Sequence, residues 1–180
     1  MQINFYIMLA EAVIILFELR SLMQSSGIDY YHPATQTVVK LTEPVMKLLP
    51  FRNKSIKGFY YAGFIVAFVL ALMFWFGFVA KFASSLNITA IIMFSVLMTI
   101  KSFGYLILFL LLAQALCSWL PATRGYSFMF GQLTYPIVAP VQKIIPPIGM
   151  IDISLMIVMI AIFALNRLAY SIFGLYWAIL

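Results

Sequence analysis

An uncharged apolar run of 23 residues, from Gly58 to Ala80, constrains the fold of this chain more than any other feature. A helix of that length spans about 35 Å, which is enough to cross a hydrocarbon core of about 30 Å. The rest of the chain agrees, because 65% of its residues are hydrophobic and only 9% are charged. Soluble domains carry about 25% charged residues. The sequence therefore predicts an integral membrane protein.

Three further apolar segments predict three more spanning helices. They run from about Ile3 to Met23, within 88–120, and from near Asp152 or Ser154 towards Leu180. None shows the strict alternation of a transmembrane barrel strand, so the predicted class is an all-α protein with four transmembrane helices. Residues 1–5 form no basic n-region and no small-residue cleavage site is seen, so we expect the first segment to be a retained helix and not a signal peptide.

The chain also contains a weak internal repeat. Residues 133–137 read Leu-Thr-Tyr-Pro-Ile and match Leu-Thr-Glu-Pro-Val at residues 41–45, close to half the chain length earlier. This spacing predicts two parallel tandem repeats, residues 1–87 and 88–180. Each repeat would contain a helix, an amphipathic surface segment broken by proline, and a second helix.

The surface segments are expected in the two connections that hold all eight prolines, residues 24–57 and 121–150. Apolar residues recur there at helical spacing, which favours short helices at Ala34 to Leu49 and Tyr126 to Ile145 that lie in the membrane surface. We expect Pro44 to interrupt the first segment. The turn from Asp29 to Pro33 is a helix-start signal, with proline suited to the first helical position.

Basic residues concentrate in the same two connections, with Lys81 alone on the opposite side of the membrane. The positive-inside rule then places both connections in the cytoplasm and both termini outside. A nucleic-acid partner is not expected, because these residues lie beside membrane segments, where anionic lipid headgroups or a partner complex are the simpler contacts. The basic residues are Lys40, Lys47, Arg52, Lys54, Lys57, Arg124 and Lys143.

Five charged residues lie within or near the predicted spans: Glu11, Glu18, Arg20, Lys101 and Arg167. An ionised side chain at the bilayer centre costs on the order of 3 kcal/mol, so each needs a partner or water. Glu11 and Glu18 are two helical turns apart and share a face. Two interpretations stay open: an ion or proton path gated by Lys101 or Arg167, or buried ion pairs that fix helix register. Four helices form a narrow bundle, so a pore would require a homo-oligomer.

Catalytic and metal chemistry find little support. His32 and Cys117 are the single histidine and cysteine, so no cluster has metal-ligand spacing and no metal or cofactor is expected. Phosphate loops and nucleophile motifs are missing from the sequence. The chain is therefore not expected to be an enzyme, and Asp29 with His32 is interpreted as a capped, solvated turn.

Several of these residues together resemble the YggT family of small bacterial inner-membrane proteins. The first repeat carries an arginine, an aromatic turn and a Thr-x-Pro, and the second a fuller proline-rich pattern. The matching positions are Arg20, Asp29, Tyr30, Pro33, Thr42, Pro44, Trp119, Pro136, Pro140, Pro146, Gly149 and Asp152. The first repeat departs from the family pattern after Pro44, because it lacks the Pro-x-x-x-Pro, paired-basic and Gly-x-Ile-Asp pattern.

The resemblance implies two tandem copies of a loop-and-helix unit in the bacterial cytoplasmic membrane. It also implies tolerance of osmotic stress through ion handling, with potassium or protons as candidates, and it aligns Glu11 and Lys101 with an intramembrane glutamate and lysine. Plastid and cyanobacterial relatives look like assembly or division factors. The alternative is therefore a non-catalytic membrane scaffold that docks a partner complex or anionic lipid.

Overall fold

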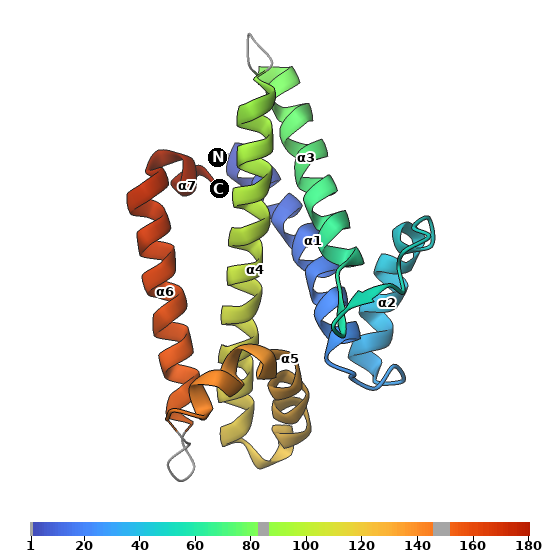
Figure 1. Cartoon of the computed structure of the whole chain (residues 1–180), viewed down its shortest axis with the longest axis vertical. Helices are drawn as coiled ribbons and strands as arrows, with labels where there is room; N and C mark the ends of the chain where they lie inside the picture. Colours follow the sequence, from blue (N-terminus) through green and yellow to red (C-terminus); the bar gives the residue numbers. More distant parts are fainter. Residues whose placement is uncertain (1, 83–86, 146–151) are drawn as a thin grey trace. The chain divides into compact units, whose positions relative to one another are not determined.

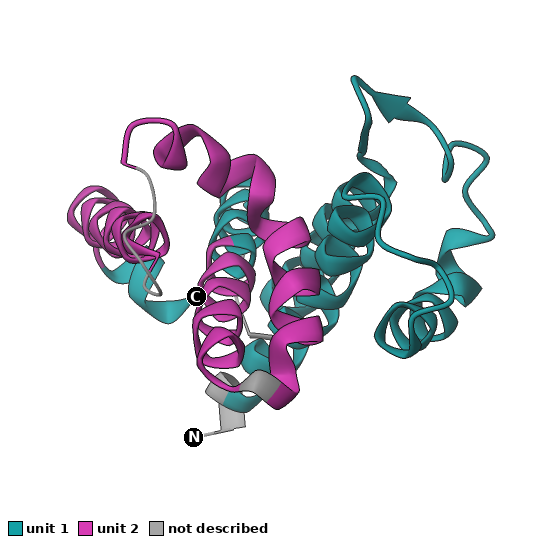
Figure 2. Cartoon of the chain, turned by 90° about the horizontal axis from the view of Figure 1, so that it is seen from below, with its two compact units in different colours: residues 1–103, 175–180 teal, residues 104–174 magenta. Residues whose placement is uncertain are grey.

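A computed structural model describes residues 2–82, 87–145 and 152–180 (Figure 1). Its described part is almost entirely helical, which confirms the predicted all-α class. The chain divides into two compact units, residues 1–103 with 175–180 and residues 104–174, shown in teal and magenta in Figure 2. The repeat boundary near residue 87 describes a relation between sequences, whereas the units describe packing, and that boundary stays a prediction.

Three helices in the described residues are long and apolar enough to cross a membrane: α3 (Ala62–Phe82), α4 (Ile88–Trp119) and α6 (Ile153–Phe173). Their composition supports a multi-pass membrane protein. The 24-residue helix α1 (Gln2–Ser25) is equally long but carries Glu11, Glu18 and Arg20. A fourth span at α1 therefore remains a prediction.

Close packing of α3 on α1 forms part of the first unit. A Cβ added at Gly63 would come within 3.0 Å of the Phe17 carbonyl oxygen and of Ser21 Oγ. Ala67 and Ala71 follow on the same face and are fully buried. The spacing of these small residues thus lets the two backbones approach, as it does between membrane helices generally.

A small β-hairpin precedes α3, where the sequence predicts the start of a helix at Gly58. Strands β1 (Ser55–Ile56) and β2 (Phe59–Tyr60) pair in antiparallel fashion around a two-residue turn. Lys57 and Gly58 have φ angles of 52° and 85°, and two positive values in succession are the requirement of a type I′ hairpin turn. The helix accordingly begins at Ala62, four residues later than expected.

Helix α2 (Pro33–Met46) begins as the sequence predicts. His32 is its N-cap, because Nδ1 accepts a hydrogen bond of 3.3 Å from the Ala34 amide. Asp29 Oδ1 accepts a second bond of 3.0 Å from the Tyr31 amide. These contacts satisfy backbone donors that a helix start leaves open, so the interpretation of Asp29 and His32 as a capped turn is confirmed.

The prediction that proline breaks the surface segments is wrong at Pro44, Pro136 and Pro140. α2 continues through the first of them, and α5 (Arg124–Gln142) continues through the other two. An internal proline removes one backbone donor and pushes its ring against the preceding turn, which a helix accommodates by bending. In agreement, α5 changes direction along its length (Figure 1).

The apolar residues of α2 do not all lie on one side of the helix, although their helical spacing predicted a single apolar face. Val38 is buried in the first unit, where α2 packs on α1, together with Thr42 and Met46. Leu41, by contrast, is 61% exposed and Leu48 is 80% exposed. The exposed apolar side of α2 is therefore the one that holds Leu41, and Leu48 lies just beyond the end of the helix.

The second unit contains the end of α4, the short helix η1 (Pro121–Thr123), α5 and α6. Asp152 is the N-cap of α6, since its Oδ1 accepts a 2.9 Å bond from the Ser154 amide. Its other oxygen accepts a 2.8 Å bond from Gln142 Nε2. The predicted helix start is thus confirmed, and the same carboxylate joins it to α5. The last helix, α7 (Leu175–Ile179), belongs to the first unit.

Candidate functional site

Two carboxyl groups on α1 form the core of the candidate site. Glu18 is completely buried, whereas Glu11, two turns earlier, is partly exposed. Among the described residues, Oε2 of Glu18 and Oε1 of Glu11 are buried without a hydrogen-bond partner. Buried polar atoms are nearly always paired, and an unpaired one points to strain, bound water or function. The two glutamates therefore stand out from the apolar residues around them.

Helix α4 supplies the partner of Glu18. Ser102 Oγ donates a 2.8 Å hydrogen bond to Glu18 Oε1, and Ser102 is itself fully buried. The same hydroxyl lies 3.0 Å from the Thr99 carbonyl oxygen and can donate there instead. A hydroxyl with two alternative acceptors can turn its O–H bond from one acceptor to the other, so the hydrogen bond to Glu18 can break without movement of the helices.

Lys101, the neighbour of Ser102, contacts Trp177 of helix α7. Its ammonium donates a 3.0 Å bond to the Trp177 carbonyl oxygen and lies 5.7 Å from the centroid of the Trp177 ring. Both contacts suit the amine of a lysine that is only 9% exposed. Helix α7 thus holds the Lys101 side chain in place within the first unit.

Glu11 and Lys101 line one open pocket of about 440 Å³, together with Ile7, Met8 and the last three residues of the chain. A space of that size, with a carboxylate and an ammonium in its wall, can hold several waters. The arrangement is therefore an open pocket with two ionisable side chains in its wall, and a fully buried carboxyl group two helical turns further along α1.

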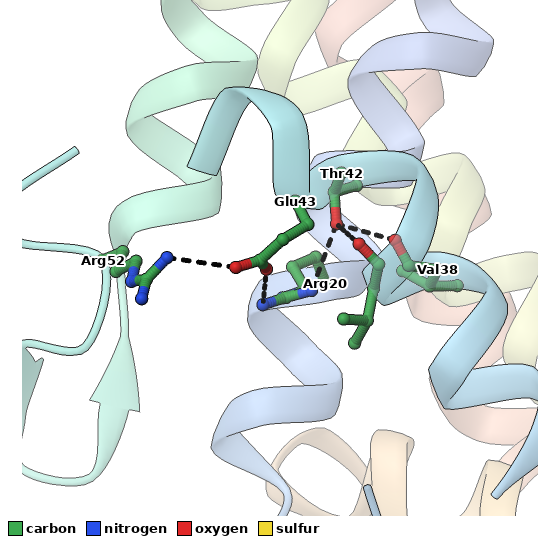
Figure 3. Close-up of polar contacts among 6 residues, drawn as sticks. Arg20, Val38, Thr42, Glu43 and Arg52 are labelled. Atoms are coloured by element: carbon green, nitrogen blue, oxygen red, sulfur yellow. Dashed lines mark hydrogen bonds and ion pairs between the residues drawn. The ribbon is translucent and has the colours of Figure 1, made fainter. Parts of the chain in front are cut away.

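A second polar cluster joins α1 to α2 and is shown in Figure 3. Glu43 lies between two guanidinium groups, with Oε2 3.1 Å from Arg20 and Oε1 3.0 Å from Arg52. Arg20 also donates a 3.3 Å bond to Thr42, whose hydroxyl donates to the Val38 carbonyl oxygen. Arg20 is therefore a link between helices and belongs to a different cluster from Glu18.

An equivalent contact exists in the second unit. Thr134 is the counterpart of Thr42 in the internal repeat, and both are completely buried. Its hydroxyl lies 2.7 Å from Gln114 Oε1 on α4 and 3.1 Å from the Phe130 carbonyl oxygen. In both units a threonine on the surface helix thus bonds a polar side chain of the preceding long helix.

The remaining predicted residues are dispersed. Arg167 is exposed on α6, with its guanidinium 5.8 Å from the Tyr170 ring centroid, and belongs to the second unit. Trp119 ends α4 and is 69% exposed. Pro146 and Gly149 lie outside the described residues. Arg52 is half-buried beside Glu43. The other basic residues of the two connections are exposed: Lys40, Lys47, Lys54, Lys57, Arg124 and Lys143.

The sequence reasoning missed three participants. Ser102 gives no pattern of its own, although its position beside Lys101 could have marked it. Glu43 lies inside the repeated Leu-Thr-x-Pro segment and could have been offered as the partner of Arg20. The Trp177 carbonyl oxygen carries no sequence signal, because backbone acceptors are set by the fold. In the described ranges no three His, Cys, Asp or Glu residues lie close enough to hold a metal ion.

Comparison with known proteins identifies the family of the chain. The family profile described as CCB3/YggT matches residues 93–173. A Vibrio alginolyticus protein, described as uncharacterized and in the proC 3′ region, is 34% identical over 163 residues, 88% of each chain. A Haemophilus influenzae protein described as uncharacterized is 30% identical over 89% of this chain and 87% of its own.

The YggT protein of Escherichia coli K12, also described as uncharacterized, is 29% identical over 82% of this chain and 78% of its own. No solved structure matches the chain significantly. These relatives cover between 82% and 89% of this chain, and the profile covers α5 and α6 with most of α4. The chain belongs to the YggT family.

Proposed function

We propose that this protein moves protons across the bacterial cytoplasmic membrane along Glu11 and Glu18, and that this ion handling supports tolerance of osmotic stress. The observation that carries the proposal is the pair of carboxyl groups on one face of α1, one in an open pocket that could admit water and one fully buried. Ionisable residues inside membrane proteins commonly form proton relays, because an isolated charge there is unfavourable.

The charge of Lys101 favours protons over potassium as the transported species. A cation such as potassium would enter a pocket that already holds the amine of Lys101, and two cations within a few ångströms of each other repel. A proton needs no cage of oxygen ligands and can pass between carboxyl groups, a hydroxyl and water. Ser102 is placed to assist, since its hydroxyl contacts Glu18 and has a second acceptor.

Proton movement into vesicles tests the proposal. Full-length protein is reconstituted with a pH-sensitive dye inside, and internal pH is followed after an imposed membrane potential. Wild-type protein should acidify the vesicles, and Glu18→Gln should reduce the rate at least tenfold while the helical circular dichroism is retained. Amide nitrogen cannot release a proton, although the side chain keeps its size and its hydrogen bond.

A pair of buried serines on α4 provides the matched comparison. Ser102 contacts Glu18, whereas Ser95 is equally buried and donates only to the Ile91 carbonyl oxygen, at 2.7 Å. Ser102→Ala should slow proton entry several-fold, and Ser95→Ala should leave it unchanged. Folded wild-type protein that passes no protons would contradict the proposal and favour the scaffold function.

A further inference from the structure

A pocket of about 590 Å³ with both polar and apolar walls lies in the second unit, between the end of α4 and α5. Gln114 and Ser118 of α4 line one side, Ser127 and Gly131 of α5 line the other, and Arg124 lies among them. Gly131 leaves room there, because an added Cβ would come within 3.2 Å of Gln114 Nε2. Hydroxyl, amide and guanidinium groups therefore line one space, although the two serine hydroxyls donate to backbone carbonyl oxygens of Ala115 and Gln114.

The first unit contains a pocket of the same construction, about 300 Å³ in volume, between α1 and α2. The residues from the long helix are 94 positions apart in the two pockets, and those from the surface helix are 92 apart. The corresponding pairs are Arg20 with Gln114, Gln24 with Ser118, Thr35 with Ser127, and Val39 with Gly131. Two halves of one chain have thus kept the same concave site, although its side chains differ.

The pocket of the second unit lies at the end of α4, where this long helix would reach the lipid headgroups. α4 has 32 residues and is about 48 Å long, well beyond a hydrocarbon core of about 30 Å. Gln114 and Ser118 lie in its last two turns. Trp119, Phe128 and Tyr135 nearby are between 64% and 70% exposed, and aromatic side chains favour the membrane–water interface. The pocket therefore opens at headgroup depth.

We propose that each of these two pockets binds the headgroup phosphate of one anionic phospholipid. In the second unit Arg124 can offer a planar pair of N–H donors to two phosphate oxygens, and the Nε2 amide group of Gln114 lies in the same pocket wall. In the first unit Arg20 lines the pocket, and Arg20 and Arg52 share the single carboxylate Glu43, so this cluster of three residues carries one net positive charge. Both sites thus match a singly charged phosphodiester.

Native mass spectrometry of the full chain in a neutral detergent tests this inference. The probe is a short-chain phosphatidylglycerol, compared with a diacylglycerol of the same chain length and with inorganic phosphate. Two phosphatidylglycerol molecules should bind each chain, and both comparison molecules should bind at least tenfold more weakly. Equal binding of the diacylglycerol would show that acyl chains alone are recognised, and equal binding of inorganic phosphate would exclude a lipid-specific site.

Two charge-neutralising variants on α5 and its C-cap separate the pocket from general attraction. Arg124→Gln should weaken one of the two binding events at least tenfold, because it removes the guanidinium from the pocket. Lys143→Gln removes the same charge from an exposed position outside the pocket and should change binding less than twofold. Equal losses in the two variants, or no loss in Arg124→Gln with circular dichroism unchanged, would overturn the assignment.

Discussion

Substitution of Gly63 by alanine tests the packing that supports the candidate site. The added Cβ would come within 3.0 Å of the Phe17 carbonyl oxygen and of Ser21 Oγ, and a backbone oxygen cannot move aside at little cost. Overpacking of this kind destabilises by about 1–3 kcal/mol. The higher helix propensity of alanine returns up to about 1 kcal/mol. The expected net loss is therefore about 1–2 kcal/mol in the free energy of unfolding.

Gly77 provides the control on the same helix, because a Cβ there would meet nothing within 4 Å. Gly77→Ala should stabilise the protein by about 0.5–1 kcal/mol through helix propensity alone. Unfolding by sodium dodecyl sulfate in mixed micelles, followed by circular dichroism, measures both variants. If Gly63→Ala is as stable as Gly77→Ala, the close approach of α1 and α3 is wrong, and so is the placement of Glu18 that depends on it.

Three further outcomes are expected. Asp152→Ala should lower the free energy of unfolding by about 1 kcal/mol through loss of the helix cap, and an unchanged midpoint would contradict that role. A double-mutant cycle of Glu11→Gln and Lys101→Gln should give a coupling free energy below about 1 kcal/mol if water fills the pocket. A coupling free energy of about 3 kcal/mol or more would indicate a dry ion pair. Cysteines at Lys54 and Arg124 should resist an impermeant maleimide added outside intact cells, and rapid labelling would reverse the proposed topology.

The sequence predicts the features that depend on local chemistry. Asp152 and His32 were expected at helix starts, since short polar acceptors before a helix satisfy its first amides. The membrane helices follow from apolar length. The hairpin turn at Lys57 and Gly58 was not predicted, because a lysine at positive φ is uncommon and the flanking strands have only two residues each.

Features that depend on packing were harder to predict. Pro136 and Pro140 suggested a broken segment, yet the helix continues and bends, a balance that sequence alone does not fix. Val38 and Leu41 both lie on an apolar face, and only the contact of α2 with α1 decides which is buried. The partnership of Ser102 with Glu18 joins residues 84 positions apart. Such contacts follow from the fold and leave no spacing to detect.

The reversal potential of the reconstituted protein in a planar bilayer tests proton movement most directly. Opposing gradients of pH and potassium are imposed across the bilayer, and the voltage of zero current is measured for the wild-type protein and for Glu18→Gln. Proton movement through Glu18 predicts a reversal potential that follows the pH gradient in the wild type and a conductance that is lost in the variant. A reversal potential that follows potassium, or a conductance unchanged in Glu18→Gln, would contradict it.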